Sequence, residues 1–527
     1  MAIHFISVLG TGLYEPIQYE LQDYNSGEQQ YIQAALIKRY KDQLSENGKI
    51  SIFLTSEARK RNWENRIYEK WEESAAQRWN SASKADVIEG NEKRGLKYLL
   101  EQEFGTNGRI KGISIEDAST QNKIWSVFQA IYSEIEEGDE IIFDITHGFR
   151  SIPMLAIIIL NYARVTKGCQ IGGIYYGAYE AARDHNGIAP IVDLTVYNEI
   201  LQWTSATEAF IQYGNADQIQ MVYKEKMKNI SNDEKKNWSG VSKTVAAMKN
   251  LADTIATCRG VNADRLSNVG KEKNKTKEKK SIKCAYQGFK REVEKDWSKQ
   301  TKEIIPLHRL LGQAKENYSQ FDQEKDYEIG LEVVKWSIQN NMTQQGYTAL
   351  EETVKTFLCD IYGMDNTLEK NRDGVIGTMM NVIYYFNEKK GFKIKEEEQY
   401  QPEIRQNMKK YANNYMKSRY RETDEDEDER ELSKYSEIVA TLPIEIAMLG
   451  HEIKNGRNDI NHFGFNMSPA SAEGLKKNLE SYLNRFENFL QEKLEKFKKL
   501  VENYRELEKI RKIGIISLRV GKLSYII

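Results

Sequence analysis

An arginine and a histidine five residues apart, Arg457 and His462, are the residues of the second half of the chain best suited to chemistry. An imidazole moves protons near neutral pH, and a guanidinium stabilises negative charge that develops on a phosphoryl group. Such a pair supports attack of an RNA 2′-hydroxyl on the neighbouring phosphate, a reaction that requires no metal ion. A solvated surface pair has the same spacing, so the two residues alone leave both interpretations open.

Asn458 follows the arginine, and the preceding Asn455-Gly456 is typical of the end of a helix. Five residues correspond to about 140° of rotation, so Arg457 and His462 would diverge on one regular helix. We therefore expect Arg457 to lie at a loop-to-helix junction, where the start of the new helix also favours phosphate.

Near the other end of the chain, polar residues follow a predicted buried strand, in the run from Asp144 to Ser151. Open α/β sheets bind ligands at the carboxyl ends of parallel strands. A tight turn at Gly148 and the amides of the following helix suit a phosphate, and further donors come from Thr146, His147 and Arg150. The run predicts a site for an anionic nucleotide, although Asp144 and Thr146 could instead cap the turn.

Two other strand ends add to this candidate site. The first predicted strand ends in Gly10-Thr11-Gly12, whose glycines let backbone amides approach a phosphate or ribose closely, and Thr55-Ser56 ends the second. A dinucleotide-binding fingerprint needs a third glycine where Glu15 stands, which argues against a nicotinamide enzyme. The predicted ligand-binding residues are Gly10, Thr11, Gly12, Thr55, Ser56, Asp144, Thr146, His147, Gly148, Phe149 and Arg150.

The elements that must position these residues follow from the hydrophobic pattern. Residues 1 to about 200 alternate β-rich runs with helical stretches, which is typical of a sheet flanked by helices. Strands are predicted over His4–Leu9, Ile50–Thr55 and Glu140–Thr146. A helix is predicted over Ser151–Val165, with Pro153 suitably placed in its first turn.

An antiparallel ribbon is predicted to close this domain. Its strands, Ile171–Ala178 and Ile191–Val196, are joined through Asp184–Gly187, where an Asn-Gly pair is a strong turn signal. From about Trp203 the β signal fades, and apolar residues at helical spacing continue to about Lys512. The fold class is therefore α/β plus all-α.

The predicted organisation has four parts. They are an α/β domain over 1–200, a helical connector over 201–225, a helical region over 226–512 and a terminal strand or hairpin over 513–527. Two charge runs without apolar periodicity, Lys271–Lys280 and Glu422–Glu429, are predicted to be exposed loops.

Composition narrows the class of protein. The 527 residues carry 76 basic and 78 acidic side chains, so the net charge is close to zero. A nucleic acid or an anionic lipid would therefore have to bind to a local basic patch. The four cysteines have neither metal-site nor disulfide-framework spacing. The chain starts without a basic leader, and its longest apolar run, Ile152–Leu160, is far shorter than the ~20 residues that span a bilayer. We expect a cytoplasmic protein with no metal, no cofactor and no membrane partner.

The Leu9–Gly12 turn and the run from Asp144 to Met154 together resemble the CARF domains of CRISPR-associated ancillary proteins. The resemblance covers about residues 1 to 200. It implies a Rossmann-like dimer that binds cyclic oligoadenylate, the second messenger of type III CRISPR systems, across its two-fold axis. Cyclic tetra-adenylate is the ring that the resemblance favours.

The stretch from Arg457 to His462 resembles the R-x4-H motif of HEPN ribonucleases, and CARF followed by HEPN is a known family pairing. The resemblance implies a large helical HEPN domain that cuts single-stranded RNA without metal and leaves a 2′,3′-cyclic phosphate. The catalytic residues would be Arg457, Asn458 and His462. In that family the motifs of two chains meet, which implies a composite site in a homodimer or higher homo-oligomer.

Two alternatives stay open. One is a ligand-sensing regulator that binds nucleic acid or protein without cutting, in which His462 has no role. The other is a sensor that also degrades its activator, with Thr11, Thr55 or His147 aligning the 2′-hydroxyls of the ring. Outside these sites, His451 is predicted to be structural, and the helical insert over 215–440 has no assigned role.

Overall fold

The computed structural model divides the chain into two compact units, Met1–Gln202 and Trp203–Ile527. This boundary falls within helix α8 (Thr195–Tyr213), close to the predicted end of the α/β domain. The predicted loops Lys271–Lys280 and Glu422–Glu429 lie outside the described residues. The structure describes residues 2–12, 14–22, 24–67, 87–88, 92–106, 108–147, 152–260, 281–296, 304–388, 393–395, 398–419 and 434–523.

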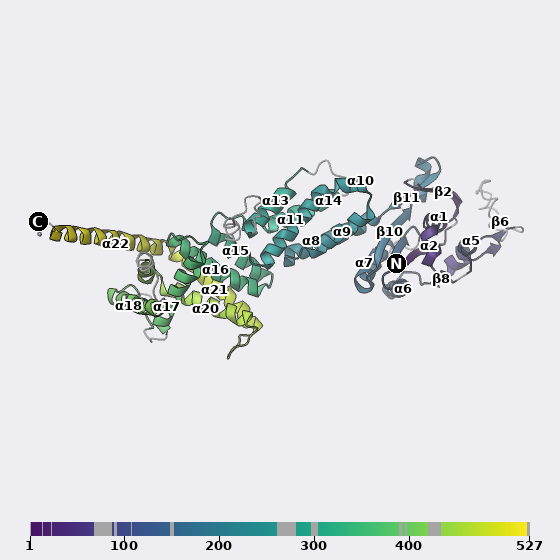
Figure 1. The fold of residues 1–527 in the computed structure, drawn as a ribbon. Helices are drawn as coiled ribbons and strands as arrows, with labels where there is room; N and C mark the ends of the chain where they lie inside the picture. Colours follow the sequence, from purple (N-terminus) through teal and green to yellow (C-terminus); the bar gives the residue numbers. More distant parts are fainter. Residues whose placement is uncertain are drawn as a thin grey trace. The chain divides into compact units, whose positions relative to one another are not determined.

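Eight strands form the main sheet of unit 1, in the order β3-β2-β11-β10-β9-β1-β4-β8 (Figure 1). Their bounds are β1 Ile3–Leu9, β2 Ile17–Leu21, β3 Tyr24–Gln29, β4 Lys49–Leu54, β8 Ile110–Ser114, β9 Glu140–Asp144, β10 Gln170–Gly177 and β11 Ile188–Asp193. A small second sheet is formed by β5 Arg66–Ile67, β6 Val87–Ile88 and β7 Glu92–Lys93. The three strands predicted first are confirmed as β1, β4 and β9.

The central strands β10-β9-β1-β4-β8 are parallel. The chain places β4 and then β8 on one side of β1, and later adds β9 and β10 on its other side. Ile6 of β1 consequently pairs with Ser51 of β4 and with Phe143 of β9. The strand order reverses between β1 and β9, the position at which such sheets open a ligand crevice.

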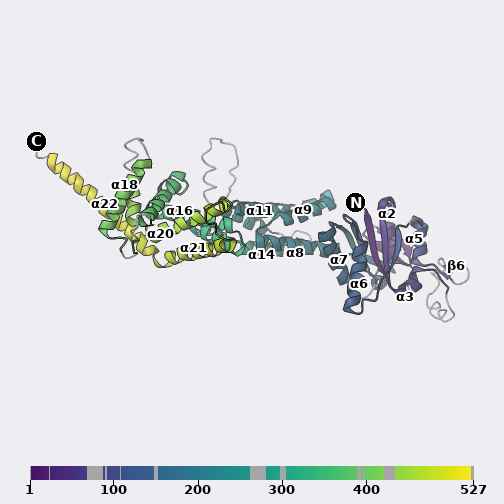
Figure 2. The same cartoon turned by 90° about the horizontal axis from the view of Figure 1, so that it is seen from below.

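Helices cover both faces of this sheet (Figure 2). Along β1, Phe5 and Leu9 join the core under one group of helices, whereas Ile6 and Val8 join the core under the other. Unit 1 is therefore the expected Rossmann-like, three-layer α/β domain. The first group is α1 Ile32–Arg39, α2 Lys41–Asn47 and α5 Leu96–Phe104, and the second is α6 Gln121–Glu134 and α7 Ile152–Lys167.

The predicted antiparallel ribbon is present as β10 and β11. Asn186 and Gly187 adopt φ values of 55° and 82°, which an Asn-Gly pair tolerates well. The second strand begins three residues earlier than predicted, at Ile188, and ends at Asp193. The chain then enters α8, so Thr195 and Val196 are helical rather than extended.

Unit 2 is helical, as predicted, and buries two cores. One core includes Trp203, Phe210 and Phe289, the other includes Phe357 and Phe486, and α15 contributes to both. The helices are α9 Asp217–Asn229, α10 Asn232–Asn237, α11 Ser239–Ala256, α13 Ile282–Val293, α14 Ile304–Asn317, α15 Asp326–Gln339, α16 Thr343–Ile361, α17 Thr378–Glu388, α18 Pro402–Arg419, α20 Ile444–Asn461, α21 Ala472–Glu492 and α22 Leu494–Leu523.

The end of the chain differs from the prediction. Helix α22 continues to Leu523, so the strand or hairpin predicted over 513–527 is wrong up to that residue. The apolar residues Ile513, Ile516 and Val520 have β-like composition, but their spacing of three and four residues is that of a helix. The preceding Lys- and Glu-rich helix therefore continues without interruption.

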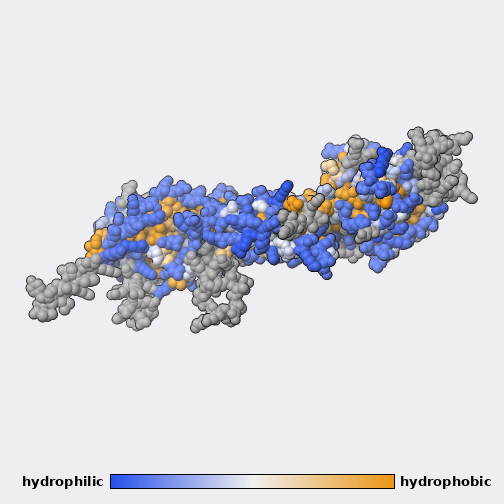
Figure 3. Space-filling view, turned by 90° about the horizontal axis from the view of Figure 1, so that it is seen from above, coloured by the Kyte–Doolittle hydropathy of each residue, from blue (hydrophilic) through white to orange (hydrophobic). Residues whose placement is uncertain are grey.

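Most of the surface drawn in Figure 3 is hydrophilic, with smaller apolar patches. This agrees with a composition in which 29% of the residues are charged. Within the described part of the chain, no helix combines the length and apolar character that crossing a bilayer requires.

Candidate functional site

The ends of β1, β4 and β9 bring three predicted segments to one edge of the sheet. Gly10-Thr11-Gly12 follows β1, Thr55-Ser56 follows β4, and Asp144–His147 spans the end of β9 and the residues after it. Because these strands are consecutive and parallel, their carboxyl ends are neighbours. The remaining predicted residues of this site, Gly148, Phe149 and Arg150, lie outside the described residues.

The glycine turn after β1 is held by Asn62. The Nδ2 group of Asn62 donates to the carbonyl oxygens of Gly10 and Gly12, at 2.9 Å in both cases. A Cβ on Gly10 would lie 2.5 Å from the Tyr14 hydroxyl and 3.4 Å from the His147 Cβ. On Gly12, it would meet Tyr14 no closer than 3.5 Å. A side chain at position 10 would therefore have to displace the Tyr14 hydroxyl, whereas one at position 12 would make only an ordinary contact.

The rings of Tyr14 and His147 lie against each other, with centroids 4.4 Å apart. Burial lowers the pKa of His147, although the charges of Asp144 and Glu180 act in the opposite direction. The imidazole is therefore neutral at pH 7. Its Nε2 is buried and has no hydrogen-bond partner among the described residues, which is rare for a buried polar atom.

Asp144 and Thr146 fasten the turn instead of facing outward. Asp144 is fully buried, and its Oδ2 accepts a hydrogen bond of 2.7 Å from the Ser7 hydroxyl. Its Oδ1 accepts from the amide and the hydroxyl of Thr146, at 3.0 and 2.5 Å. The Thr146 oxygen accepts from the Gly177 amide at 2.8 Å. These bonds join β9 to β1 and β10, which gives both residues a positioning role.

The threonines and the serine of the predicted ligand-binding set differ in whether their hydroxyl groups are accessible to a ligand. The Thr55 hydroxyl accepts a 3.2 Å hydrogen bond from the Ala58 amide and caps the short helix α3 (Ser56–Ala58). Thr11 and Ser56 are exposed. Thr11 and Ser56 are therefore the described hydroxyl groups at this edge that a ligand can reach directly.

Sequence reasoning missed Tyr14 and Asn62. Asn62 lies in a turn of π-helix, η1 (Arg59–Trp63), which follows α3. Its bonds reach residues 52 and 50 positions away, so no local spacing points to them. The available signal was an asparagine just beyond a predicted strand end.

The second predicted site lies at the end of α20. Arg457 and Asn458 belong to its last turns, and His462 is the C-cap, so the predicted helix end at Asn455-Gly456 is wrong. A Cβ on Gly456 would overlap the ring of Tyr347 in α16. This glycine is present because it allows a close helix contact, and α20 continues through it.

Arg457 is held by a buried carboxylate. Its Nη1 lies 2.8 Å from Oε2 of Glu351 in α16, as an ion pair without the alignment of a hydrogen bond. The Glu351 side chain is 3% exposed, against 26% for Arg457. The other oxygen of Glu351 lies 2.9 Å from Nζ of Lys355. Two cations therefore compensate for the burial of one carboxylate, which anchors the guanidinium to α16.

The ion network extends beyond Lys355. Its Nζ lies 3.0 Å from Glu352 and 2.6 Å from Asp373 of the π-helical turn η6 (Lys370–Gly377). Arg372 also binds Glu352, with Nε 3.1 Å from Oε2. Burial disfavours the charged form of Glu352, but the charges of Lys355 and Arg372 outweigh burial and lower the pKa of this carboxyl.

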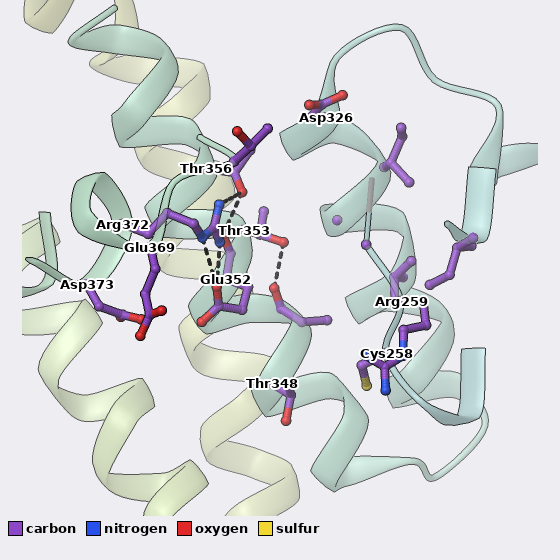
Figure 4. Close-up of a pocket in the computed structure, with 17 residues that line it drawn as sticks. Cys258, Arg259, Asp326, Thr348, Glu352, Thr353, Thr356, Glu369, Arg372 and Asp373 are labelled. Atoms are coloured by element: carbon purple, nitrogen blue, oxygen red, sulfur yellow. Dashed lines mark hydrogen bonds and ion pairs between the residues drawn. The ribbon is translucent and has the colours of Figure 1, made fainter. Parts of the chain in front are cut away.

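A pocket of about 460 Å³ lies beside the network (Figure 4). Glu352, Arg372 and Asp373 contribute to its wall, Asp326 contributes from α15, and Arg259 contributes from the residues after α11. Neither Arg457 nor His462 lines it. It is therefore distinct from the predicted catalytic pair.

Arg457 faces α16, whereas His462 is exposed at the end of α20. The rotation of about 140° between them follows directly from the continuous helix. Asn458 lies beside the arginine, with its Oδ1 3.5 Å from Nη2 of Arg457. One chain therefore presents the two members of the pair in different directions.

His451 lies within the same helix and has a packing role. Its ring stacks on Tyr384, with centroids 3.5 Å apart and planes 12° from parallel. The structural role predicted for His451 agrees with this contact.

Within the described parts of the chain, His, Cys, Asp and Glu side chains do not gather in groups of three or more that could hold a metal ion.

Known proteins resemble this chain in unit 1 and, for one relative, over a stretch longer than unit 1. The family model for the CARF domain of the CRISPR system endoribonuclease Csx1 matches residues 4–195. The CRISPR-associated protein MJ1674 of Methanocaldococcus jannaschii is 27% identical over 308 residues. That alignment covers 57% of this chain and 42% of the relative, so the chain spans less than half of that protein's length. Residues 4–195 are a CARF domain, the type that senses cyclic oligoadenylates, and the chain is a CRISPR-associated, CARF-containing protein.

Proposed function

We propose that the chain is an endoribonuclease that cyclic oligoadenylate activates and that cuts single-stranded RNA without a metal ion in type III CRISPR defence. The observation that carries the catalytic part is the anchoring of Arg457 by buried Glu351 beside an exposed His462. A solvated surface pair has no need of a buried counter-charge. The match of unit 1 to the Csx1 CARF domain supports the sensing part.

Cyclic tetra-adenylate is the proposed activator. The edge formed after β1, β4 and β9 offers the exposed hydroxyls of Thr11 and Ser56, and behind them the buried Nε2 of His147, which has no hydrogen-bond partner among the described residues. Helix α7 begins just beyond this edge, and its N-terminus favours an anion. These are hydrogen-bonding groups suited to a phosphate, ribose or base.

A homodimer is proposed because α7 carries an uncovered apolar stripe. Met154, Ile158, Tyr162 and Val165 are exposed at spacings of four, four and three residues, which places them on one side of the helix. The other side of α7 is buried in the core of unit 1. A second copy packed on this stripe would bring two ligand edges together, because the stripe starts in the first turn of α7.

In the proposed reaction, His462 accepts the proton of a ribose 2′-hydroxyl, and the oxygen attacks the adjacent phosphorus. The bond from phosphorus to the 5′-oxygen breaks, and that oxygen takes up a proton. The products carry a 2′,3′-cyclic phosphate and a 5′-hydroxyl. Arg457 stabilises the additional negative charge on the phosphoryl oxygens, and Asn458 orients the arginine or the RNA.

The composite site follows from the geometry of α20. Since Arg457 and His462 diverge within one chain, the proposed site pairs the arginine of one protomer with the histidine of its partner. Ligand binding would favour this active arrangement and act through α8, which belongs to both units.

Cleavage of a fluorescent single-stranded RNA in EDTA, with and without cyclic tetra-adenylate, tests the proposal. We expect cutting by the unaltered chain with ligand and a loss of about 100-fold or more in His462→Ala. His185→Ala, which alters an exposed histidine of unit 1, is the matched control. Equal cutting by His462→Ala would remove this histidine from the mechanism. Absence of cutting even with cyclic hexa-adenylate would favour the noncatalytic regulator.

A further inference from the structure

The loop after His462 presents three large apolar side chains to solvent. Phe463, Phe465 and Met467 are 88%, 87% and 105% exposed, and the next most exposed large apolar side chain among the described residues is Val165, at 73%. Exposed apolar side chains are ordinary when they are scattered singly. Three at alternate positions of one loop form a concentrated patch.

This loop is held in place by Asp459. The Gly464 amide donates to the Asp459 carbonyl at 2.9 Å, and the Ala470 amide donates to its Oδ2 at 2.9 Å. The side chain of Asn466 donates to the other carboxylate oxygen. Phe463 has a φ of 57°, which non-glycine residues rarely adopt. The backbone thus holds the apolar side chains outward at some conformational cost.

We propose that residues 463–467 form a stacking surface for the bases of single-stranded RNA at the site of Arg457 and His462. This proposal rests on the ribonuclease function proposed above. Aromatic rings stack on bases of any sequence, because every base has a π face. Phe463 is the residue after His462, so a base that stacks there holds its own phosphate chain near the histidine.

The charge that follows the loop also suits RNA. Helix α21 starts soon after the loop, and its first turns carry two exposed lysines: Lys476, which donates to the Asn341 side chain, and Lys477, which pairs with Glu473 at the surface. Ammonium groups beside an aromatic surface are the combination with which proteins bind the phosphates and bases of single strands.

A second copy of the chain fits the patch less well. Three side chains of this size offer roughly 500 Å² of apolar surface, whereas a stable interface buries about 800 Å² on each partner. The longer stripe on α7, described above, is the better candidate for contact between copies. The loop after His462 is therefore assigned to the smaller occupant, the bases of RNA.

Fluorescence anisotropy with a labelled single-stranded RNA tests the proposal on full-length protein carrying His462→Ala, so that cleavage does not interfere. Adding Phe465→Ala should weaken binding about ten-fold or more, and Phe465→Trp should retain it. RNA with abasic sugars keeps its phosphates and should bind the parent weakly, with no further loss in Phe465→Ala. Leu507→Ala, an exposed apolar residue of α22, should leave binding unchanged.

Unchanged affinity in Phe465→Ala, or abasic RNA that binds the parent as tightly as ordinary RNA, would overturn the proposal. So would RNA that does not bind the parent at all. Loss of affinity that follows dissociation of the protein in analytical ultracentrifugation would assign the loop to a contact between copies. If the unaltered chain binds RNA through Phe465 but never cuts it, the ribonuclease function fails and the stacking surface stands.

Discussion

The edge of the sheet in unit 1 and the end of α20 in unit 2 hold their polar groups in different ways. At the sheet edge, hydrogen bonds from Ser7 and Thr146 to the buried Asp144 carboxylate, and from Asn62 to backbone carbonyls, fix the turns. At α20, buried charges anchor Arg457 on α16, while His462 projects into solvent. The sheet edge has its scaffold within one chain, whereas Arg457 and His462, the proposed catalytic pair, diverge within one chain.

Complementation between two inactive variants is the strongest test of this difference, because it asks whether Arg457 and His462 from different chains form one site. Arg457→Ala and His462→Ala should each lose about 100-fold or more of the RNA cleavage rate. Mixed and allowed to exchange subunits, they should regain a large part of it. A mixed dimer contains one site with an intact arginine from one chain and an intact histidine from the other.

The readout is the rate of RNA cleavage with cyclic tetra-adenylate before and after mixing. Each variant mixed with itself is the control. A mixture that stays as inactive as its components would show that the site lies within one chain, and the comparison between the two regions would fail.

The buried carboxylate behind Arg457 offers the next largest effect. Glu351→Gln removes the negative charge between Arg457 and Lys355. We expect about 1 to 3 kcal/mol less free energy of unfolding, because the partly buried Arg457 loses its ion-pair partner, whereas Lys355 keeps Glu352 and Asp373. Cleavage should fall about 100-fold as the guanidinium moves from its position.

Urea unfolding and RNA cleavage measure the two effects. Glu328→Gln is the matched control, because Glu328 pairs with Lys325 at the surface, where such pairs contribute about 0 to 1 kcal/mol. If Glu351→Gln lowers stability but cuts RNA normally, the residue is structural and does not position Arg457.

The smallest expected effect sharpens the account of the sheet edge. Gly10→Ala places a Cβ against the Tyr14 hydroxyl and the His147 side chain, and the overcrowding should weaken binding of cyclic tetra-adenylate about ten-fold. Gly12→Ala introduces only an ordinary contact and should have little effect. Isothermal titration calorimetry compares the two, and equal affinities would contradict the packing role of Gly10.

Part of the fold could be predicted because local patterns carry it. The β-rich, mostly apolar runs of β1, β4 and β9 and the Asn-Gly turn of the ribbon depend on neighbouring residues, and each was found close to its predicted place. The end of α20 was not predicted. Gly456 has the local character of a helix end, but contact with Tyr347 of another helix explains its presence.

In the candidate sites too, local patterns could be predicted from the sequence and long-range contacts could not. Spacing alone placed Gly10, Thr55 and Asp144 at strand ends, and their convergence followed from parallel order. Sequence spacing could not show that the Asp144 side chain is buried and bonded to Ser7, because that hydrogen bond joins residues 137 positions apart.

By itself, the sequence determined the α/β-then-helical organisation, the polar strand ends and the spacing of Arg457 and His462. The tertiary structure decided which strand-end side chains are buried or exposed, which carboxylate anchors Arg457, and that Arg457 and His462 point in different directions within one chain. The physical reason is the separation along the chain over which each kind of interaction acts. Periodicity and turn preferences act between neighbours along the chain, whereas burial and ion pairing depend on segments that only packing brings together.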